Sequence, residues 1–235
     1  MPTHIDPWHP NLNWDTPSGK VLRKLVDALP SHIKPLITVF GSAPIQMGID
    51  SGLVSADVDI FAEEDLKEVV EKNNLGKNQS NIYIQVCSEL NFRTSPKWQR
   101  RVYLVQFEKC VLQFPHPIDI LIAKLNRAEE KDLHAFEIVL KKTGHPTEAE
   151  LLEELRDAVD LYRPGFDEEN ATDLVANTKF LWKRLYKKEI NPRTDIIQVA
   201  LQRRKEGYGE PPQDLKQELR NIAKKRPPPK KSRKA

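Results

Sequence analysis

The chain has 235 residues, 39% of them hydrophobic and 30% charged, which is enough for one hydrophobic core and a smaller helical part. Its apolar runs are short and interrupted by charges, and its start lacks a basic region followed by an apolar run. We therefore expect a soluble, cytoplasmic protein that does not interact with membranes. The formal charge is +3, but the last twelve residues carry seven basic groups and no acidic one, so the rest of the chain has a formal charge of −4.

The first segments predict an arm, a helix, a strand and a tight turn. Residues 1–16 are rich in Pro, His, Asn and Trp and predict an irregular arm, whereas apolar residues at helical spacing predict a helix over residues 17–29. Residues 35–40 predict a buried strand. The Gly41-Ser42 pair after it predicts a tight turn, and residues 43–47 predict at most a short helix.

A second predicted strand, over residues 58–61, brings two aspartates close together. Asp57 and Asp59 are two positions apart, and alternate side chains of a strand point to the same face. Two carboxylates on one face repel each other unless a cation lies between them. A helix with acidic residues at its start and basic residues at its end is expected next, over residues 63–73.

Three further segments predict strands, so the sheet should have about five. Residues 82–86, 102–107 and 110–114 are rich in β-branched and aromatic residues. A long helix is then expected over residues 118–142, and Gly144 is expected to end it.

The rest of the chain predicts helices alone. A capping box at Thr147-Glu-Ala-Glu150 opens a helix to about residue 162, and two more are expected over residues 168–188 and 193–206. Strands with interspersed helices, followed by helices alone, are typical of the α+β class. We therefore predict a mixed sheet with flanking helices, followed by a helical C-terminal region.

Four parts of the chain are predicted. They are the arm (1–16), a sheet domain (17–144), a helical domain (145–207) and a basic, disordered tail (208–235). The tail could bind the phosphates of a nucleic acid electrostatically, or it could be solvated without a specific partner.

The strand, the Gly-Ser turn and the Asp-x-Asp strand together favour a nucleotide site. Two carboxylates on one face can bind Mg²⁺ through oxygen, and the metal can bridge substrate phosphates. A turn of small residues lets backbone N–H groups approach a triphosphate without a clash.

These residues resemble the signature of the nucleotidyltransferase superfamily. Phe40-Gly41-Ser42 and Asp57-Val58-Asp59-Ile60 match it in order and residue type. The spacer of 14 residues between Ser42 and Asp57 is slightly longer than usual. The resemblance implies a nucleotidyltransferase-like fold, an NTP substrate and Mg²⁺.

A second segment, residues 118–132, resembles the lysine-containing helix of AbiEii-type nucleotidyltransferase toxins and their uncharacterised relatives. Lys124, Arg127, Lys131 and Asp132 occupy the matching places. The three basic residues have the spacing i, i+3 and i+7, so one helix face could present them to phosphates; the alternative is an ordinary solvated face. This resemblance implies an RNA acceptor and a cognate antitoxin as partner.

Members of the superfamily usually hold a third carboxylate, which helps to activate the attacking hydroxyl. Glu108, after the strand at 102–107, is our first candidate. Asp119 is the alternative, although its place in the first turn of a helix is explained by the helix dipole alone.

The leading prediction is a Mg²⁺-dependent nucleotidyltransferase that moves a nucleoside monophosphate from an NTP to a hydroxyl of an RNA, such as a tRNA, or of a protein. The alternative is a degenerate transferase fold that binds nucleic acid or protein without catalysis. The predicted site residues are Asp57 and Asp59 for metal and catalysis, Glu108 for catalysis, and Gly41, Ser42, Lys124, Arg127 and Asp132 for the nucleotide.

Two other features remain open in the sequence. Trp98 beside Arg100 and Arg101 could stack on a base, or it could lie on an exposed edge. Cys87 and Cys110 lie in separate apolar segments, so reduced thiols without a chemical role are expected rather than a disulfide.

Overall fold

The computed structural model describes residues 5–6, 8–163 and 173–208. The strands within these ranges form one five-stranded sheet with the order β3-β2-β1-β5-β4. β1 pairs antiparallel with β2 and parallel with β5, while β3 is parallel to β2 and β4 is antiparallel to β5. The predicted mixed sheet is confirmed. Its strands are β1 (Leu36–Phe40), β2 (Asp57–Phe61), β3 (Tyr83–Val86), β4 (Tyr103–Gln106) and β5 (Val111–Phe114).

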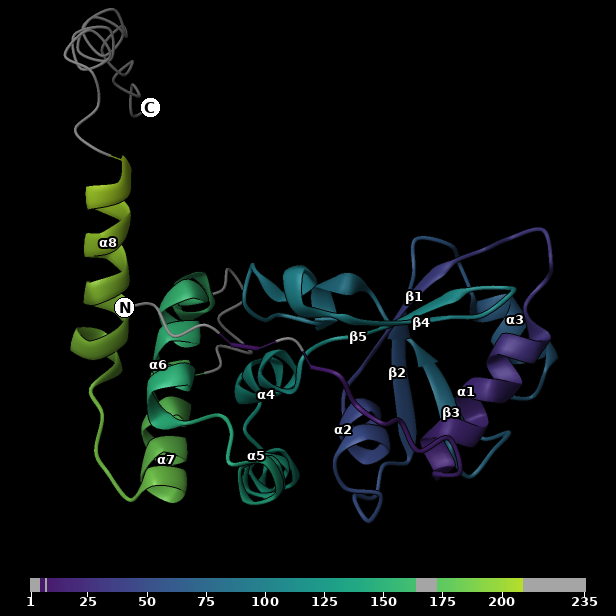
Figure 1. Cartoon of the computed structure of the whole chain (residues 1–235), viewed down its shortest axis with the longest axis horizontal. Helices are drawn as coiled ribbons and strands as arrows, with labels where there is room; N and C mark the ends of the chain where they lie inside the picture. Colours follow the sequence, from purple (N-terminus) through teal and green to yellow (C-terminus); the bar gives the residue numbers. More distant parts are fainter. Residues whose placement is uncertain (1–4, 7, 164–172, 209–235) are drawn as a thin grey trace, which may run out of the picture.

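Helices flank the sheet and then continue as a helical region (Figure 1). Figure 1 shows α4 and α5 between the sheet and α6, α7 and α8. The helices are α1 (Pro17–Ala28), α2 (Ala43–Gly48), α3 (Lys67–Lys72), α4 (Pro117–Leu125), α5 (Glu130–Thr143), α6 (Glu148–Asp157), α7 (Leu174–Tyr186) and α8 (Val199–Tyr208). Shorter turns are η1 (Glu89–Asn91), η2 (Trp98–Arg101), η3 (Val159–Tyr162) and η5, a π-helix at Arg193–Gln198.

Two hydrophobic clusters hold these elements together. One joins α1 and α3 to the sheet through residues such as Leu22, Ile37 and Val70. The other extends from Phe40 in β1 through α4 and α5 to Leu181 in α7. The second cluster thus joins residues on both sides of Gly144, and the predicted division into a sheet domain and a helical domain stays a prediction.

Trp98 belongs to the second cluster. Its ring packs edge-on against Phe61 and Phe92, and its side chain is buried. Trp98 therefore neither stacks on a base nor lies on an exposed edge, and both readings of this residue are wrong.

The prediction of one long helix over residues 118–142 is wrong, because two helices cover this range. α4 ends at Leu125 and α5 begins at Glu130. Between them Ala128 has a φ of +49°, which no helical residue adopts. Gly144 does end α5 in the left-handed conformation, and Thr147 makes the predicted capping box at the start of α6.

Other boundaries also differ. α3 begins at Lys67 rather than near residue 63, after a turn in which the carboxylate of Asp65 accepts the Lys67 N–H at 3.0 Å. The helix expected over residues 168–188 begins, in the described part, at Leu174. Residues 164–172 and most of the predicted basic tail lie outside the described residues. None of the described helices is long and apolar enough to cross a membrane.

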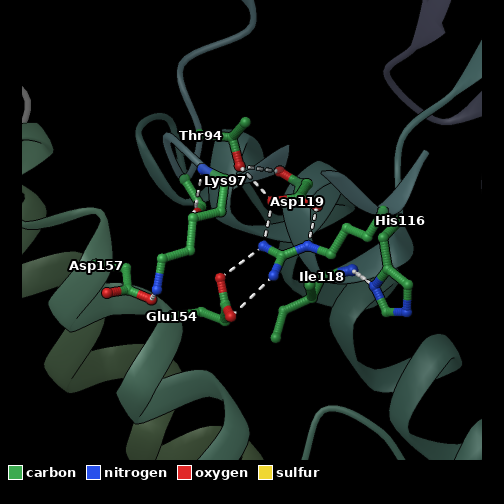
Figure 2. Close-up of polar contacts among 9 residues, drawn as sticks. Thr94, Lys97, His116, Ile118, Asp119, Glu154 and Asp157 are labelled. Atoms are coloured by element: carbon green, nitrogen blue, oxygen red, sulfur yellow. Dashed lines mark hydrogen bonds and ion pairs between the residues drawn. The ribbon is translucent and has the colours of Figure 1, made fainter. Parts of the chain in front are cut away.

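A buried cation joins the sheet half to the helical region. Arg101 in η2 binds Asp119 of α4 through Nε and Nη2, both at 2.7 Å, and binds Glu154 of α6 through Nη1 at 2.8 Å. Asp119 and Glu154 are buried, and the Arg101 side chain is 10% exposed. Figure 2 shows Asp119 and Glu154 in this cluster, with the more exposed Lys97–Asp157 pair beside them.

His116 caps the start of α4. Its Nδ1 accepts the N–H of Ile118 at 3.2 Å (Figure 2). Burial, together with the positive charge of Arg101, lowers the pKa of His116 to about 3, although the charge of Glu150 opposes the shift. Protonation would both charge a buried ring and remove the acceptor that caps the helix.

The free energy of unfolding should consequently fall as the pH drops below 6.5. The unfolded chain takes up a proton at the ordinary pKa of 6.5, whereas folded His116 stays neutral until the pH reaches about 3. Between neutral pH and pH ~5 the loss due to His116 should be about 2 kcal/mol. His116→Asn keeps a capping acceptor but does not titrate. Urea unfolding at the two pH values should therefore show a loss of unfolding free energy that is smaller in this variant than in the wild type by about 2 kcal/mol. An equal loss in both proteins would contradict this role.

Candidate active site

The site lies where β1 ends beside β2. Phe40 pairs with Asp59 across the two strands, so Gly41 follows directly beside the Asp59 carboxylate. Gly41 has a φ of +71°, and a Cβ placed on it would lie 2.3 Å from Asp59 Oδ2. The backbone conformation therefore favours glycine here, and any Cβ would push the Asp59 carboxylate aside.

Gly41→Ala should displace Asp59 as well as strain the turn. The left-handed conformation costs a residue with a Cβ about 1–2 kcal/mol, and the collision adds to this cost. Gly144→Ala is a matched control, because its φ is +75° but nothing lies within 4 Å of the added Cβ. Both variants should lose unfolding free energy, but only Gly41→Ala should also weaken the Mg²⁺-dependent NTP binding that the sequence predicts, by at least about tenfold (about 1.4 kcal/mol) in calorimetry. Equal nucleotide binding by the two variants would contradict the close approach.

The two aspartates lie on the same face of β2. Both are half-buried. Burial, together with the charge of Asp57, raises the pKa of Asp59 to about 6, against the opposing influence of Cys87 and Lys124. Ser55 Oγ donates to Asp57 Oδ1 at 3.3 Å, and Cys87 Sγ donates to Asp59 Oδ1 at 3.7 Å.

The two cysteines form no disulfide, as expected. Cys110 is buried, and Cys87 lies half-buried next to Asp59. Burial raises the pKa of Cys87 to about 12 and that of Cys110 to about 11, so both thiols are protonated and unreactive at neutral pH.

A lysine reaches from α4 to the Gly-Ser turn. Lys124 Nζ donates to Ser42 Oγ at 3.0 Å and to Asp132 Oδ1 at 3.1 Å. Arg127 binds the same carboxylate through Nε at 2.8 Å and Nη2 at 2.9 Å. Asp132 therefore orients both cations, one buried and one half-exposed.

Asp132 itself is 0% exposed. Burial opposes its ionisation, but the hydrogen bonds from Arg127 and Lys124 hold the pKa of Asp132 below its usual value. The break between α4 and α5 makes this arrangement possible, because in one continuous helix residues 124 and 132 would lie about 12 Å apart along the axis. The basic stripe expected on a single helix face is therefore wrong, although Lys124, Arg127 and Lys131 all line one cleft.

This cleft has a volume of about 1340 Å³. The Gly-Ser turn, both aspartates, Lys124 and Arg127 line it, and Asp132 lies buried beneath the two cations. The structure thus brings together seven of the eight predicted site residues. The eighth, Glu108, is not among them.

Glu108 does not reach the cleft. β5 is parallel to β1, with Val111 paired to Leu36, so the turn that carries Glu108 lies beside the start of β1. Gly41 follows the opposite end of β1, and Glu108 cannot act as the third carboxylate. The alternative, Asp119, does not line the cleft either, because it is buried against Arg101.

The donor set of the cleft fits Mg²⁺. Carboxylate oxygens are the ligands this ion prefers, and Asp57 and Asp59 offer two that face no basic group within hydrogen-bonding distance among the described residues. Across the described ranges, no three His, Cys, Asp or Glu side chains form a metal-binding group. Mg²⁺ usually keeps waters and takes further ligands from substrate phosphates, so two carboxylates suffice.

The cleft also contains several residues that the sequence alone did not indicate. Gln85 pairs with Asp59 across β2 and β3 and lines the cleft at the level of the aspartates. Arg93, Lys141 and Lys142 also line the cleft. The alternation of β3 could have indicated that Gln85 shares a face with Tyr83, but not that β3 pairs with β2.

One comparison with known proteins gives a match. A protein-family model described as "Nucleotidyltransferase of unknown function (DUF6036)" matches residues 22–189, which is more than two thirds of the chain. No curated protein and no solved structure matches the sequence significantly. The matched range contains the sheet and every residue described for the cleft.

Proposed function

Because the chain belongs to this family of nucleotidyltransferases of unknown function, we propose that its cleft transfers a nucleoside monophosphate from an NTP to a hydroxyl group with the help of Mg²⁺. The observation that carries the proposal is the approach of Gly41 to Asp59, with Lys124 Nζ on Ser42 Oγ at the same turn. This arrangement puts two carboxylates, a turn of small residues and a buried cation at one place.

Each group has a role in the proposed reaction. Asp57 and Asp59 would hold Mg²⁺, which when bound neutralises phosphate charge. The backbone of Gly41 and Ser42 would approach the β- and γ-phosphates, and Lys124, held by Asp132, would bind their oxygens. Since little covalent chemistry falls to the protein in phosphoryl transfer, positioning and charge stabilisation supply most of the rate.

The reaction is a single in-line displacement. The oxygen of the acceptor hydroxyl forms a bond to the α-phosphorus, and the bond from that phosphorus to the oxygen bridging to the β-phosphate breaks. Pyrophosphate leaves, and the hydroxyl proton passes to water. Gln85, at the level of the aspartates, can hydrogen-bond the acceptor but cannot take its proton.

A labelling experiment tests the proposal. Purified protein is incubated with each α-³²P-labelled NTP, Mg²⁺ and total RNA. Label in RNA or in protein, dependent on Mg²⁺, would support transfer and identify both the base and the acceptor class. No label with any nucleotide would favour the alternative, a binding module that lost its third carboxylate together with its activity.

The resemblance of residues 118–132 to AbiEii-type toxins extends the proposal to a toxin silenced by a cognate antitoxin. The contacts of Asp132 with Lys124 and Arg127 support this extension, because they join three of the residues on which the resemblance depends. Induced expression of the wild-type chain should then arrest bacterial growth, and expression of Asp59→Asn should not. Equal growth of both cultures would contradict the toxin role while leaving the transferase proposal intact.

A further inference from the structure

The cleft is larger than a nucleotide needs. Pockets for small ligands typically have about 300–1,000 Å³, whereas this cleft has about 1340 Å³. The residues that face the proposed triphosphate lie on β1, β2 and α4. The rest of the lining includes one side of α5, which has no role in the proposed reaction.

That side of α5 is basic. Lys131, His134, Lys141 and Lys142 all line the cleft and are exposed. Their positions fall within about 100° of one another around the helix, since each residue turns it by about 100°. Arg93, which is exposed and lies in the segment between η1 and η2, adds a fifth basic group to the same cleft.

Little negative charge offsets this surface. Glu137 is the acidic residue of α5 in the cleft lining, and Arg184 of α7 binds both of its oxygens, Nε at 2.7 Å and Nη2 at 3.0 Å. Lys131 approaches Glu129 at 3.3 Å, but both side chains are more than half exposed, so this pair is weak. Arg93, Lys141 and Lys142 make no side-chain ion pair with any described residue.

The helix dipole does not account for the whole pattern. Lys141 and Lys142 lie in the last turn of α5, where basic residues are favoured in any helix. Lys131 lies in the first turn, where the dipole disfavours it, and Arg93 lies outside any helix. A ligand with several negative charges along its length explains all of these positions together.

We propose that this surface, the α5 wall formed by Arg93, Lys131, His134, Lys141 and Lys142, binds the phosphate backbone of a single-stranded nucleic acid that is the acceptor. This inference rests on the proposed function and selects one of its acceptor classes. The strand would run along α5 and place its terminal hydroxyl near the aspartate pair. A protein acceptor would offer one hydroxyl and would not need a basic wall.

Oligonucleotide binding by the full-length chain tests this inference. The probes are fluorescent U₁₂ and dT₁₂, and anisotropy is measured over a series of KCl concentrations. In the variant Lys131→Ala/Lys141→Ala/Lys142→Ala, affinity at low salt should fall at least about tenfold. The slope of log affinity against log salt should become shallower by about 2, since each phosphate contact on a single strand contributes about 0.7.

A second triple variant controls for net charge. Lys20→Ala/Lys24→Ala/Lys77→Ala removes three exposed lysines that do not line the cleft, and the basic C-terminal residues are the same in all proteins. It should bind both probes within about twofold of wild type. Unchanged binding by the wall variant, or an equal loss in both variants, would overturn the inference.

The same proteins separate this inference from the proposed function. The wall variant should bind Mg²⁺ with NTP as wild type does, because Lys124 and the aspartates are intact. Failure of the wild type to bind any NTP would refute the proposed function, whereas the oligonucleotide result would still decide whether the wall binds nucleic acid. Label that enters protein and no RNA or DNA would refute the acceptor assignment alone.

Discussion

Asp59→Asn should lower the rate of nucleotide transfer by about 10³-fold, equal to about 4 kcal/mol of transition-state stabilisation. The change keeps the shape of the side chain but removes one of the two charges that would hold Mg²⁺. It also relieves the repulsion by Asp57 in a half-buried place, so the thermal midpoint should not fall. The measurement is the initial rate of ³²P transfer at saturating Mg²⁺, with the melting temperature of the same sample.

Asp50→Asn is the matched control. Asp50 lines the same cleft, but its Oδ1 accepts the N–H of Gly52 at 3.1 Å, and asparagine can keep this bond. Its transfer rate should stay within about threefold of wild type, a change in barrier below about 0.7 kcal/mol. If Asp50→Asn lost as much activity as Asp59→Asn, the general negative charge of the cleft, rather than the aspartate pair, would be responsible.

Arg101→Met should destabilise the protein by about 3–5 kcal/mol, because it leaves Asp119 and Glu154 buried without their cation. Arg101 joins η2 to α4 and α6, so the loss should affect the contact between the sheet half and the helical region. The free energy of unfolding in urea near neutral pH gives the measurement.

Lys97→Met provides the comparison, since it removes the nearby and more exposed ion pair with Asp157 (Figure 2). That change should cost less than about 1 kcal/mol. Adding Asp119→Asn and Glu154→Gln to Arg101→Met should restore part of the stability, because the buried charges disappear as well. A loss below about 1 kcal/mol for Arg101→Met would show that the two carboxylates do not depend on Arg101.

Much of the fold could be predicted from local sequence patterns, and the wrong predictions have a common cause. The five strands, the end of α5 at Gly144 and the start of α6 at Thr147 could be predicted, because they depend on propensity and capping, which act over a few residues. The break after α4 depends on Ala128 adopting a φ of +49°, although alanine is the best helix former. Tertiary contacts override propensity there, since the break lets Asp132 meet both Lys124 and Arg127.

The site shows the same limit. The Gly-Ser turn and the Asp-x-Asp strand could be predicted because each lies in a short segment with its own chemistry. Glu108 was a wrong choice because its distance from the aspartates depends on how the strands pair. β5 runs parallel to β1, which places Glu108 beside the start of β1 and the aspartates beside its end, and the sequence does not show this pairing. For the same reason Gln85, which lies on the strand next to Asp59, was not found.

Isothermal titration calorimetry of each NTP, with Mg²⁺ and with EDTA, shows whether the aspartate pair, the Gly-Ser turn and Lys124 together hold a metal-bound triphosphate. Wild type should bind at least one NTP in a Mg²⁺-dependent manner, and Asp57→Asn/Asp59→Asn should bind it at least about tenfold more weakly, a loss of about 1.4 kcal/mol. Binding that is the same with EDTA and in the double variant, or no binding of any NTP by folded protein, would contradict the account.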